Sequence, residues 1–273
     1  MSDDEVCIQY LSDIHLEIVS SAKREAVITT CMRPAPGARV LVLAGDIGSD
    51  ANGSLQAALA FASKNWEHVV YVMGNHEYYK CREESSRVRP RSFETVEEAV
   101  GGFVRTLPNV HWLSHADPLW VMPDARVAFV GCTLWSNLKG WRGANSSCIQ
   151  DFRMSCTTPE QTTQRWERDK KVLSRAIAQA LDQVPTPKIV VVTHHLPSVT
   201  LISPRYLKDS EANLAFASSC EWLMTGVEVW IYGHTHEAGT ADVDGCVCVV
   251  NPVGYPDEDG GGSHFHHHAV VWV

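Results

Sequence analysis

The sequence predicts a layered α/β fold built as a single domain of 273 residues. Early in the chain, apolar segments typical of buried strands alternate with amphipathic segments typical of helices, and strands dominate its end. Residues 39–44 (RVLVLA) and 188–193 (KIVVVT) are almost continuous apolar runs, which is the pattern of strands buried on both faces. Such strands form sheets that helices cover, so we expect a layered arrangement.

In the first part of the chain, strands and helices follow one another closely. Residues 6–11 predict the first strand, ahead of the run at 39–44. A helix is expected at 54–66, because apolar residues recur there at helical spacing after the turn-forming pair NG. Residues 68–73 then predict a strand, and residues 92–107 predict a second helix.

A strand at 126–130 precedes the clearest helix signal in the chain. Thr158 can cap the helix, Pro159 fits its first position and Gln161 completes a capping box. An apolar stripe follows, and two prolines end the helix before the strand at 188–193. We expect one more helix at 213–224, and strands at 227–232, 239–243, 246–250 and 268–273.

Two stretches read as long cap or lid loops of the single domain. Residues 78–91 are dense in charge, and residues 135–157 are dense in Ser, Asn, Gly and Thr. Loops of this length in a compact domain are often functional, so we expect them to border a site.

Polar clusters follow five of the predicted strands at the points where the strands end. Ligands of open α/β sheets bind outside the carboxyl ends of the strands, so these clusters are expected to converge on one site. The clusters are Ser12-Asp13-Ile14-His15, Gly45-Asp46, Gly74-Asn75-His76-Glu77, His194-His195 and Gly233-His234-Thr235-His236.

The side chains of these clusters are typical ligands of transition-metal ions. Carboxylate and imidazole together favour Mn, Fe, Zn, Co or Ni, and no thiolate is present in the clusters. Of these metals, Mn is the one we expect. In Asp13-x-His15 and His234-x-His236, both side chains of the pair can turn to one side of an extended segment, because that period is two. The glycines that precede three of the clusters permit tight turns.

The series D-x-H, G-D, G-N-H-E, H and G-H-x-H resembles the calcineurin-like metallophosphoesterase superfamily. The series runs in that family's order from Asp13 to His236 and covers most of the chain. The resemblance implies a four-layer α/β/β/α sandwich with the site at its top edge. Two metal ions about 3.5–4 Å apart that share one carboxylate would supply a hydroxide nucleophile for attack on phosphorus.

The resemblance also implies how the metal ligands divide. One metal would be held by Asp13, His15 and His236. The other would be held by Asn75, His234 and one histidine of the pair 194–195, and Asp46 would bridge the two metals.

Two assignments concern the neighbours of these ligands. His76 is expected to protonate the leaving oxygen or to bind the phosphoryl group, and Glu77 is expected to orient His76. His194 is favoured as the ligand because it follows its strand directly, which leaves His195 to face the substrate. The reverse assignment of this pair remains open.

The substrate class is inferred from arginines that the chain lacks. Protein Ser/Thr phosphatases of the superfamily carry G-D-x-V-D-R-G and an arginine before G-N-H-E. This chain has GDIGSD at 45–50 and a methionine at position 73. We therefore expect hydrolysis of small or nucleotide-like phosphomonoesters or phosphodiesters. The alternatives are a protein Ser/Thr phosphatase and a non-catalytic interaction module on the same fold.

Charge and composition limit the partners and the compartment. The formal net charge of −9 argues against a surface that coats nucleic acid, although bound cations could reverse the field at one site. No apolar run is long enough to span a membrane, and the nine cysteines show no regular spacing. We expect a cytoplasmic protein with a small phosphoester substrate; the oligomeric state is left open.

Overall fold

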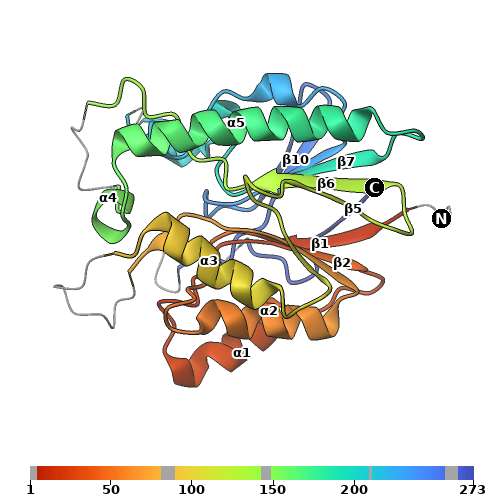
Figure 1. The fold of residues 1–273 in the computed structure, drawn as a ribbon, viewed down its shortest axis with the longest axis horizontal. Helices are drawn as coiled ribbons and strands as arrows, with labels where there is room; N and C mark the ends of the chain where they lie inside the picture. The colour runs from red at the N-terminus through yellow and green to blue at the C-terminus, as the bar shows by residue number, and fades with distance from the viewer. Residues whose placement is uncertain (1–4, 81–89, 143–148, 209–210, 256–263) are drawn as a thin grey trace.

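The structure is a computed structural model, and it describes all residues except 1–4, 81–89, 143–148, 209–210 and 256–263. Two sheets pack face to face, and helices cover the outer face of each (Figure 1). Three helices lie on one outer face: α1 (Ser21–Cys31), α2 (Ser54–Asn65) and α3 (Phe93–Val104). The long helix α5 (Pro159–Leu181) lies on the other. The predicted four-layer α/β/β/α sandwich is confirmed.

Both sheets are mixed, with parallel strands in the middle and antiparallel strands at edges. The first has the order β11-β1-β2-β3-β4, with β1 (Cys7–Leu11), β2 (Val40–Ala44), β3 (His68–Val72), β4 (Val110–Trp112) and β11 (Val270–Trp272). The second has the order β5-β6-β7-β8-β10-β9, with β5 (Leu119–Val121), β6 (Val127–Cys132), β7 (Lys188–Thr193), β8 (Val229–Tyr232), β9 (Gly239–Val243) and β10 (Cys246–Val250). Among the strands of the described residues, β11, β5 and β9 run antiparallel to their neighbours.

The apolar runs are buried on both faces, as their composition predicts. In β2, Val40 and Val42 belong to the core between the two sheets, whereas Leu41 and Leu43 belong to the core that also holds the helices. Because side chains alternate along a strand, a continuous apolar run is what two covered faces require. The packed core therefore fixes the carboxyl ends of these strands, where the polar clusters begin.

The capping box predicted for the long helix is present at the start of α5. The Thr158 hydroxyl accepts a hydrogen bond from the backbone N–H of Gln161, and the Gln161 side chain accepts one from the N–H of Thr158. Pro159 occupies the first turn, where a missing N–H costs nothing.

The helix predicted at 213–224 is wrong. Only two short 3₁₀ turns form there, η4 (Ala212–Ala215) and η5 (Glu221–Leu223). The backbone between them bonds to a neighbouring segment: Phe216 O accepts from Leu196 N at 3.1 Å, and Cys220 N donates to Pro197 O at 2.8 Å. These outside partners replace the bonds that a helix would make within itself.

Among the described elements, helix α1 and strands β4 and β5 have no counterpart in the predicted set. Helix α1 has Ser20 at its N-cap, but that side chain makes no capping hydrogen bond and the first turn holds no acidic residue, so its start signal is weak. Strands β4 and β5 are only three residues long, too short for a periodic pattern.

Residues 81–89 and 143–148 of the two expected cap loops lie outside the described residues. The 3₁₀ turn η1 (His76–Tyr78) ends at the first residue of one loop, and the short helix α4 (Asp151–Met154) lies within the other. Across the described ranges, no helix combines the length and the apolar character that crossing a membrane requires.

The histidine in β4 should make folding stability depend on pH. The His111 ring stacks on Trp120 with centroids 3.7 Å apart, and its Nε2 lies 3.4 Å from His68 Nδ1. Burial, and then the charge of His68, lower the pKa of His111 to about 4. The unfolded chain therefore takes up this proton first as the pH falls, so stability is lost between about pH 6.5 and pH 4.

We expect His111→Gln to remove this loss. Because the ring is partly exposed, the variant should reduce the slope of the unfolding free energy against pH by less than about 1 kcal/mol per pH unit. Urea unfolding of the variant and the wild-type protein at several pH values measures the difference, with the exposed His264→Gln as the control. The same pH dependence in all three proteins would contradict the prediction.

Candidate metal centre

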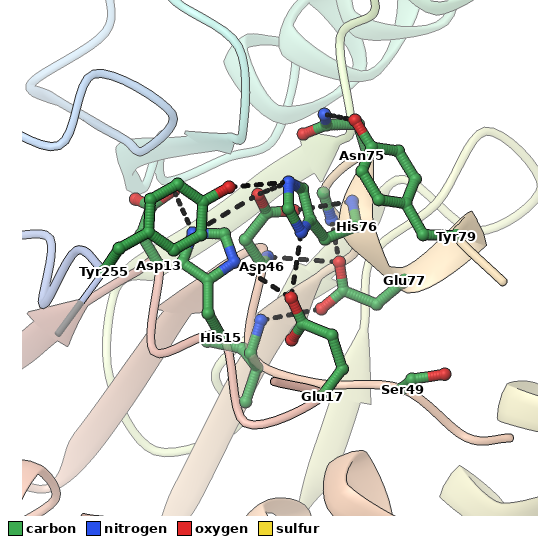
Figure 2. Close-up of polar contacts among 12 residues, drawn as sticks. Asp13, His15, Glu17, Asp46, Ser49, Asn75, His76, Glu77, Tyr79 and Tyr255 are labelled. Carbon is green, nitrogen blue, oxygen red and sulfur yellow. Dashed lines mark hydrogen bonds and ion pairs between the residues drawn. The ribbon is translucent and has the colours of Figure 1, made fainter. Parts of the chain in front are cut away.

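The five polar clusters meet at one edge of the sandwich. Figure 2 shows side chains from the clusters that follow β1, β2 and β3. They follow the carboxyl ends of β1, β2 and β3 in one sheet, and of β7 and β8 in the other. Candidate metal ligands from both sheets thus come together, as the strand ends predict.

The first group of ligand atoms comes from Asp13, His15 and His236, which lie within 4.8 Å of one another. His15 Nε2 is 3.0 Å from His236 Nε2 and 4.0 Å from Asp13 Oδ1. His15 Nδ1 lies 3.1 Å from a carboxylate oxygen of Glu17, which accepts the Nδ1 proton. The lone pair of His15 Nε2 therefore points at its neighbours in the group.

The second group comes from Asp46, His194 and His234, again within 4.8 Å, and Asn75 joins it. His194 Nδ1 donates to the carbonyl of Ala44 at 2.9 Å. Its Nε2 then faces Asn75 Oδ1 at 3.0 Å and Asp46 Oδ1 at 3.4 Å. Three lone-pair acceptors thus converge on one point, an arrangement that only a proton or a cation stabilises.

Asp46 lies between the two groups. Its Oδ1 faces His194, whereas its Oδ2 is 3.9 Å from the Nε2 of His15. The backbone N–H of His76 donates to Oδ1 at 2.9 Å and holds the carboxylate in place. One carboxylate therefore presents a separate oxygen to each group.

Left-handed backbone aims several of these side chains inward. Asp13, His15, Asp46, His234 and His236 all have φ between 51° and 69°. The extended geometry expected for Asp13-x-His15 and His234-x-His236 is thus wrong, and the side chains converge through left-handed residues instead. Such conformations cost about 1–3 kcal/mol each and concentrate at functional sites.

The glycines before the ligands serve close packing as much as turning. Gly45 has a φ of 87°, and a Cβ there would overlap the ring of His194. A Cβ on Gly74 would overlap Asp46 Oδ1, and one on Gly233 would lie 2.7 Å from the carbonyl oxygen of Ala44. Only glycine at these positions leaves the ligand atoms room to meet.

The two histidines at positions 194 and 195 have different surroundings. His194 faces Asn75 and Asp46, whereas the His195 ring packs beside His234 with centroids 4.4 Å apart. His195 is 1% exposed, and burial lowers its pKa to about 3. The geometry favours His194 as the ligand of the second group.

The charges of the site attract cations. Burial alone would raise the pKa of the Asp46 carboxyl, but His194 and His76 lower it well below its ordinary value. Burial opposes charge on His194, yet Asp46 and Asp13 raise its pKa to about 9. The same carboxylates would hold a metal, so protons and metal ions compete for this histidine.

Glu17 is a site residue that was not predicted. Its Oε1 contacts His15 Nδ1 at 3.1 Å and His76 Nδ1 at 2.9 Å. Although burial would raise the pKa of Glu17, these two histidines lower it to about 2. Glu17 therefore orients both rings, and only its spacing after D-x-H could have suggested this.

The role expected for Glu77 is wrong. Its carboxylate is fully buried and accepts hydrogen bonds from the backbone N–H groups of Gly74, Ile47 and Asp46 at 2.7, 2.8 and 3.1 Å. It joins the loops after β2 and β3 to each other, and Glu17 takes the place beside His76.

Asp151, from the second expected cap segment, fixes the amide of Asn75. Asn75 Nδ2 donates to Asp151 Oδ1 at 2.8 Å and to the Tyr79 hydroxyl at 3.1 Å, and that hydroxyl also donates to Asp151. Because an ionised carboxylate only accepts, the amide NH₂ must face Asp151 and the amide oxygen must face His194. Asp151 is only 5% exposed.

A cavity of about 330 Å³ opens beside both groups. His76 borders it, and its Nε2 lies 3.1 Å from the Tyr255 hydroxyl. Tyr79 stacks on the other side of the His76 ring, with centroids 4.1 Å apart. A ligand in the cavity would meet the candidate metal ligands and His76 together.

The chain is similar to proteins of known family. Residues 10–238 match the model of the calcineurin-like phosphoesterases. An uncharacterized protein, L509 of Acanthamoeba polyphaga mimivirus, is 24% identical over 92% of each chain. The fold is similar to that of phosphopantetheinyl hydrolase from Mycobacterium tuberculosis, with a TM-score of 0.66 and 17% identity over 93% of this chain and 91% of that one.

The matched region spans all five clusters, from the strand before Asp13 to the residues that follow His236. Its histidine and aspartate groups can bind metal ions, and the family is one of hydrolases. The chain therefore belongs to the calcineurin-like phosphoesterase family.

Proposed function

We propose that the protein hydrolyses small phosphomonoesters or phosphodiesters with the help of two divalent metal ions, of which Mn is the first candidate. The observation that carries the proposal is the position of Asp46, whose two carboxylate oxygens face two different ligand groups. A carboxylate that faces two groups in this way suits a bridge between two cations.

The donor atoms fit the proposed metals. Asp13, His15 and His236 would hold one ion, whereas Asn75, His194 and His234 would hold the other. Oxygen and imidazole donors of this kind suit Mn and its neighbours. When bound, the ions would polarise the phosphoryl oxygens and make a water molecule more acidic.

His76 is proposed as the proton donor to the leaving oxygen. Burial lowers the pKa of His76, but Asp46 and Glu17 outweigh it and raise that pKa above its ordinary value. With Nδ1 held by Glu17, Nε2 is the nitrogen that faces the cavity beside Tyr255. A proton on that nitrogen can reach a bound ester.

The size of the cavity supports a small substrate, and the free cysteines support a cytoplasmic location. A volume of about 330 Å³ suits a small ester, at the lower end of the range of ligand sites. The cysteines that the structure describes are free thiols, as expected in a reducing cytoplasm. We therefore propose a cytoplasmic enzyme with a small substrate.

Asp46→Asn tests the proposed function. The protein loaded with Mn should hydrolyse p-nitrophenyl phosphate or bis(p-nitrophenyl) phosphate, and the variant should lose at least about 100-fold in kcat, because a neutral bridge stabilises the cations less. Asp244→Asn is the matched control, since Asp244 is exposed and its φ of 52° is close to the 55° of Asp46. A metal-loaded protein inactive on a broad phosphoester panel would refute the function.

Metal analysis tests the choice within the histidine pair. His194→Ala should lose one of two bound metal ions, because His194 Nε2 faces Asn75 and Asp46. His195→Ala should keep both. The metal content of each purified variant, measured by mass spectrometry, decides between them. Loss of a metal from His195→Ala alone would reverse the assignment.

Asp151→Leu tests how Asn75 is oriented. Without its acceptor, the Asn75 amide can rotate, so the affinity of the second metal ion should fall about 10–100-fold while the first is unaffected. Calorimetric titration with Mn measures both steps. Asp151→Asn, which keeps an acceptor oxygen, should lose less. Two wild-type affinities in Asp151→Leu would show that Asp151 does not position the ligand.

A further inference from the structure

One side of the cavity is apolar. It is formed mainly by the segment between β7 and β8, which includes the 3₁₀ turns η2 (Val199–Leu201) and η3 (Pro204–Tyr206). We define the apolar wall as the side chains of Leu196, Ile202, Tyr206, Ala215 and Phe216.

Two aromatic rings of this wall remain open to solvent. Tyr206 is 39% exposed and Phe216 is 37% exposed, although large apolar side chains are usually covered. Both line the same cavity. Apolar surface gathered in a cavity beside a reactive centre is typical of a ligand site.

The wall is continuous with the candidate metal centre. The Phe216 ring stacks on His234, with centroids 4.5 Å apart and planes at 26°. A group bound against Phe216 therefore lies next to a phosphoryl group held by the metal ligands.

The backbone behind these rings is held in place. Phe216 O accepts from Leu196 N at 3.1 Å, and Ala215 O accepts from the Ser136 hydroxyl at 2.8 Å. Asn213 Nδ2 donates to the carbonyl of Tyr206 at 2.9 Å and ties the two aromatic positions together. A wall ordered before the ligand arrives loses little entropy on binding.

We propose that the apolar wall binds an aromatic group esterified to the phosphate, so that the preferred substrates are phosphoesters of aromatic or nucleoside-like alcohols. This inference rests on the proposed function. A flat ring can stack on Phe216 and cover exposed apolar surface, which an alkyl group does less well. The cavity of about 330 Å³ has room for a phosphoryl group and a ring.

Two phosphonates test whether the wall binds an aromatic group. They are not hydrolysed, because a phosphorus–carbon bond replaces the ester linkage, so binding is measured alone. Calorimetry of the Mn-loaded protein should give a Kd for phenylphosphonate at least about tenfold lower than for methylphosphonate. Phe216→Ala should remove most of that difference and leave the Kd for methylphosphonate within about twofold. Phe216→Leu, which keeps bulk but not the flat face, should fall between the two.

Trp222→Ala is the matched control, since Trp222 is 57% exposed and does not line the cavity; it should bind both phosphonates as the wild-type protein does. Equal wild-type affinities for the two phosphonates would overturn the inference. So would an equal loss of both affinities in Phe216→Ala, because Phe216 would then act through His234 and the metal ions.

Hydrolysis of p-nitrophenyl phosphate, followed in parallel, separates the two proposals. An active protein without a phenyl preference refutes the aromatic wall alone. A protein that prefers phenylphosphonate but hydrolyses no phosphoester supports the wall and refutes the proposed function.

Discussion

The structure depends on a buried carboxylate, that of Asp46, which is 1% exposed. A carboxylate taken out of water is strongly destabilising unless donors or cations compensate it. Here one N–H, from His76, and the nearby imidazoles provide part of that compensation. Asp13 is equally buried, so two negative charges lie within one small volume. Divalent cations suit such a volume, and they would compete there with the proton of His194, whose pKa is raised to about 9.

The ligand residues around this carboxylate adopt backbone conformations that are unfavourable for residues other than glycine. The left-handed conformations at Asp13, Asp46 and His234 persist because each loop starts at a packed strand and leads into another helix or strand. Those strands are rigid because both of their faces are packed, against the other sheet and against helices. The candidate metal centre therefore depends on the four packed layers, because the stability of the apolar core offsets the strain and the buried charge at its edge.

The predictable part of the molecule is the part encoded locally. Strands and the start of α5 follow from periodicity and caps, and the ligand clusters follow from polar residues placed directly after apolar runs. Individual side-chain contacts between distant loops were not predictable. Asp151 meets Asn75 across 76 positions, and no pattern near either residue indicates the pairing. Glu17 has the role that was expected for Glu77 for the same reason, because which carboxylate reaches His76 is decided by how the loops pack.

The most informative difference between prediction and structure is at residues 213–224, where a helix was expected and two 3₁₀ turns form. A regular helix at 213–224 would satisfy its own backbone and need nothing from its surroundings. The chain instead bonds to Leu196 and Pro197, which directly follow the histidine pair at the end of β7. That pairing places Phe216 against the ring of His234 while part of the Phe216 side chain lines the cavity. The loop that gives up helical structure thus both supports a ligand of the candidate metal centre and forms the wall beside it. Because its backbone bonds are made by the partner segment, an exposed side chain such as that of Phe216 can change without loss of those bonds. Metal chemistry shared across a family and a substrate preference particular to one chain can therefore arise within a few residues of each other.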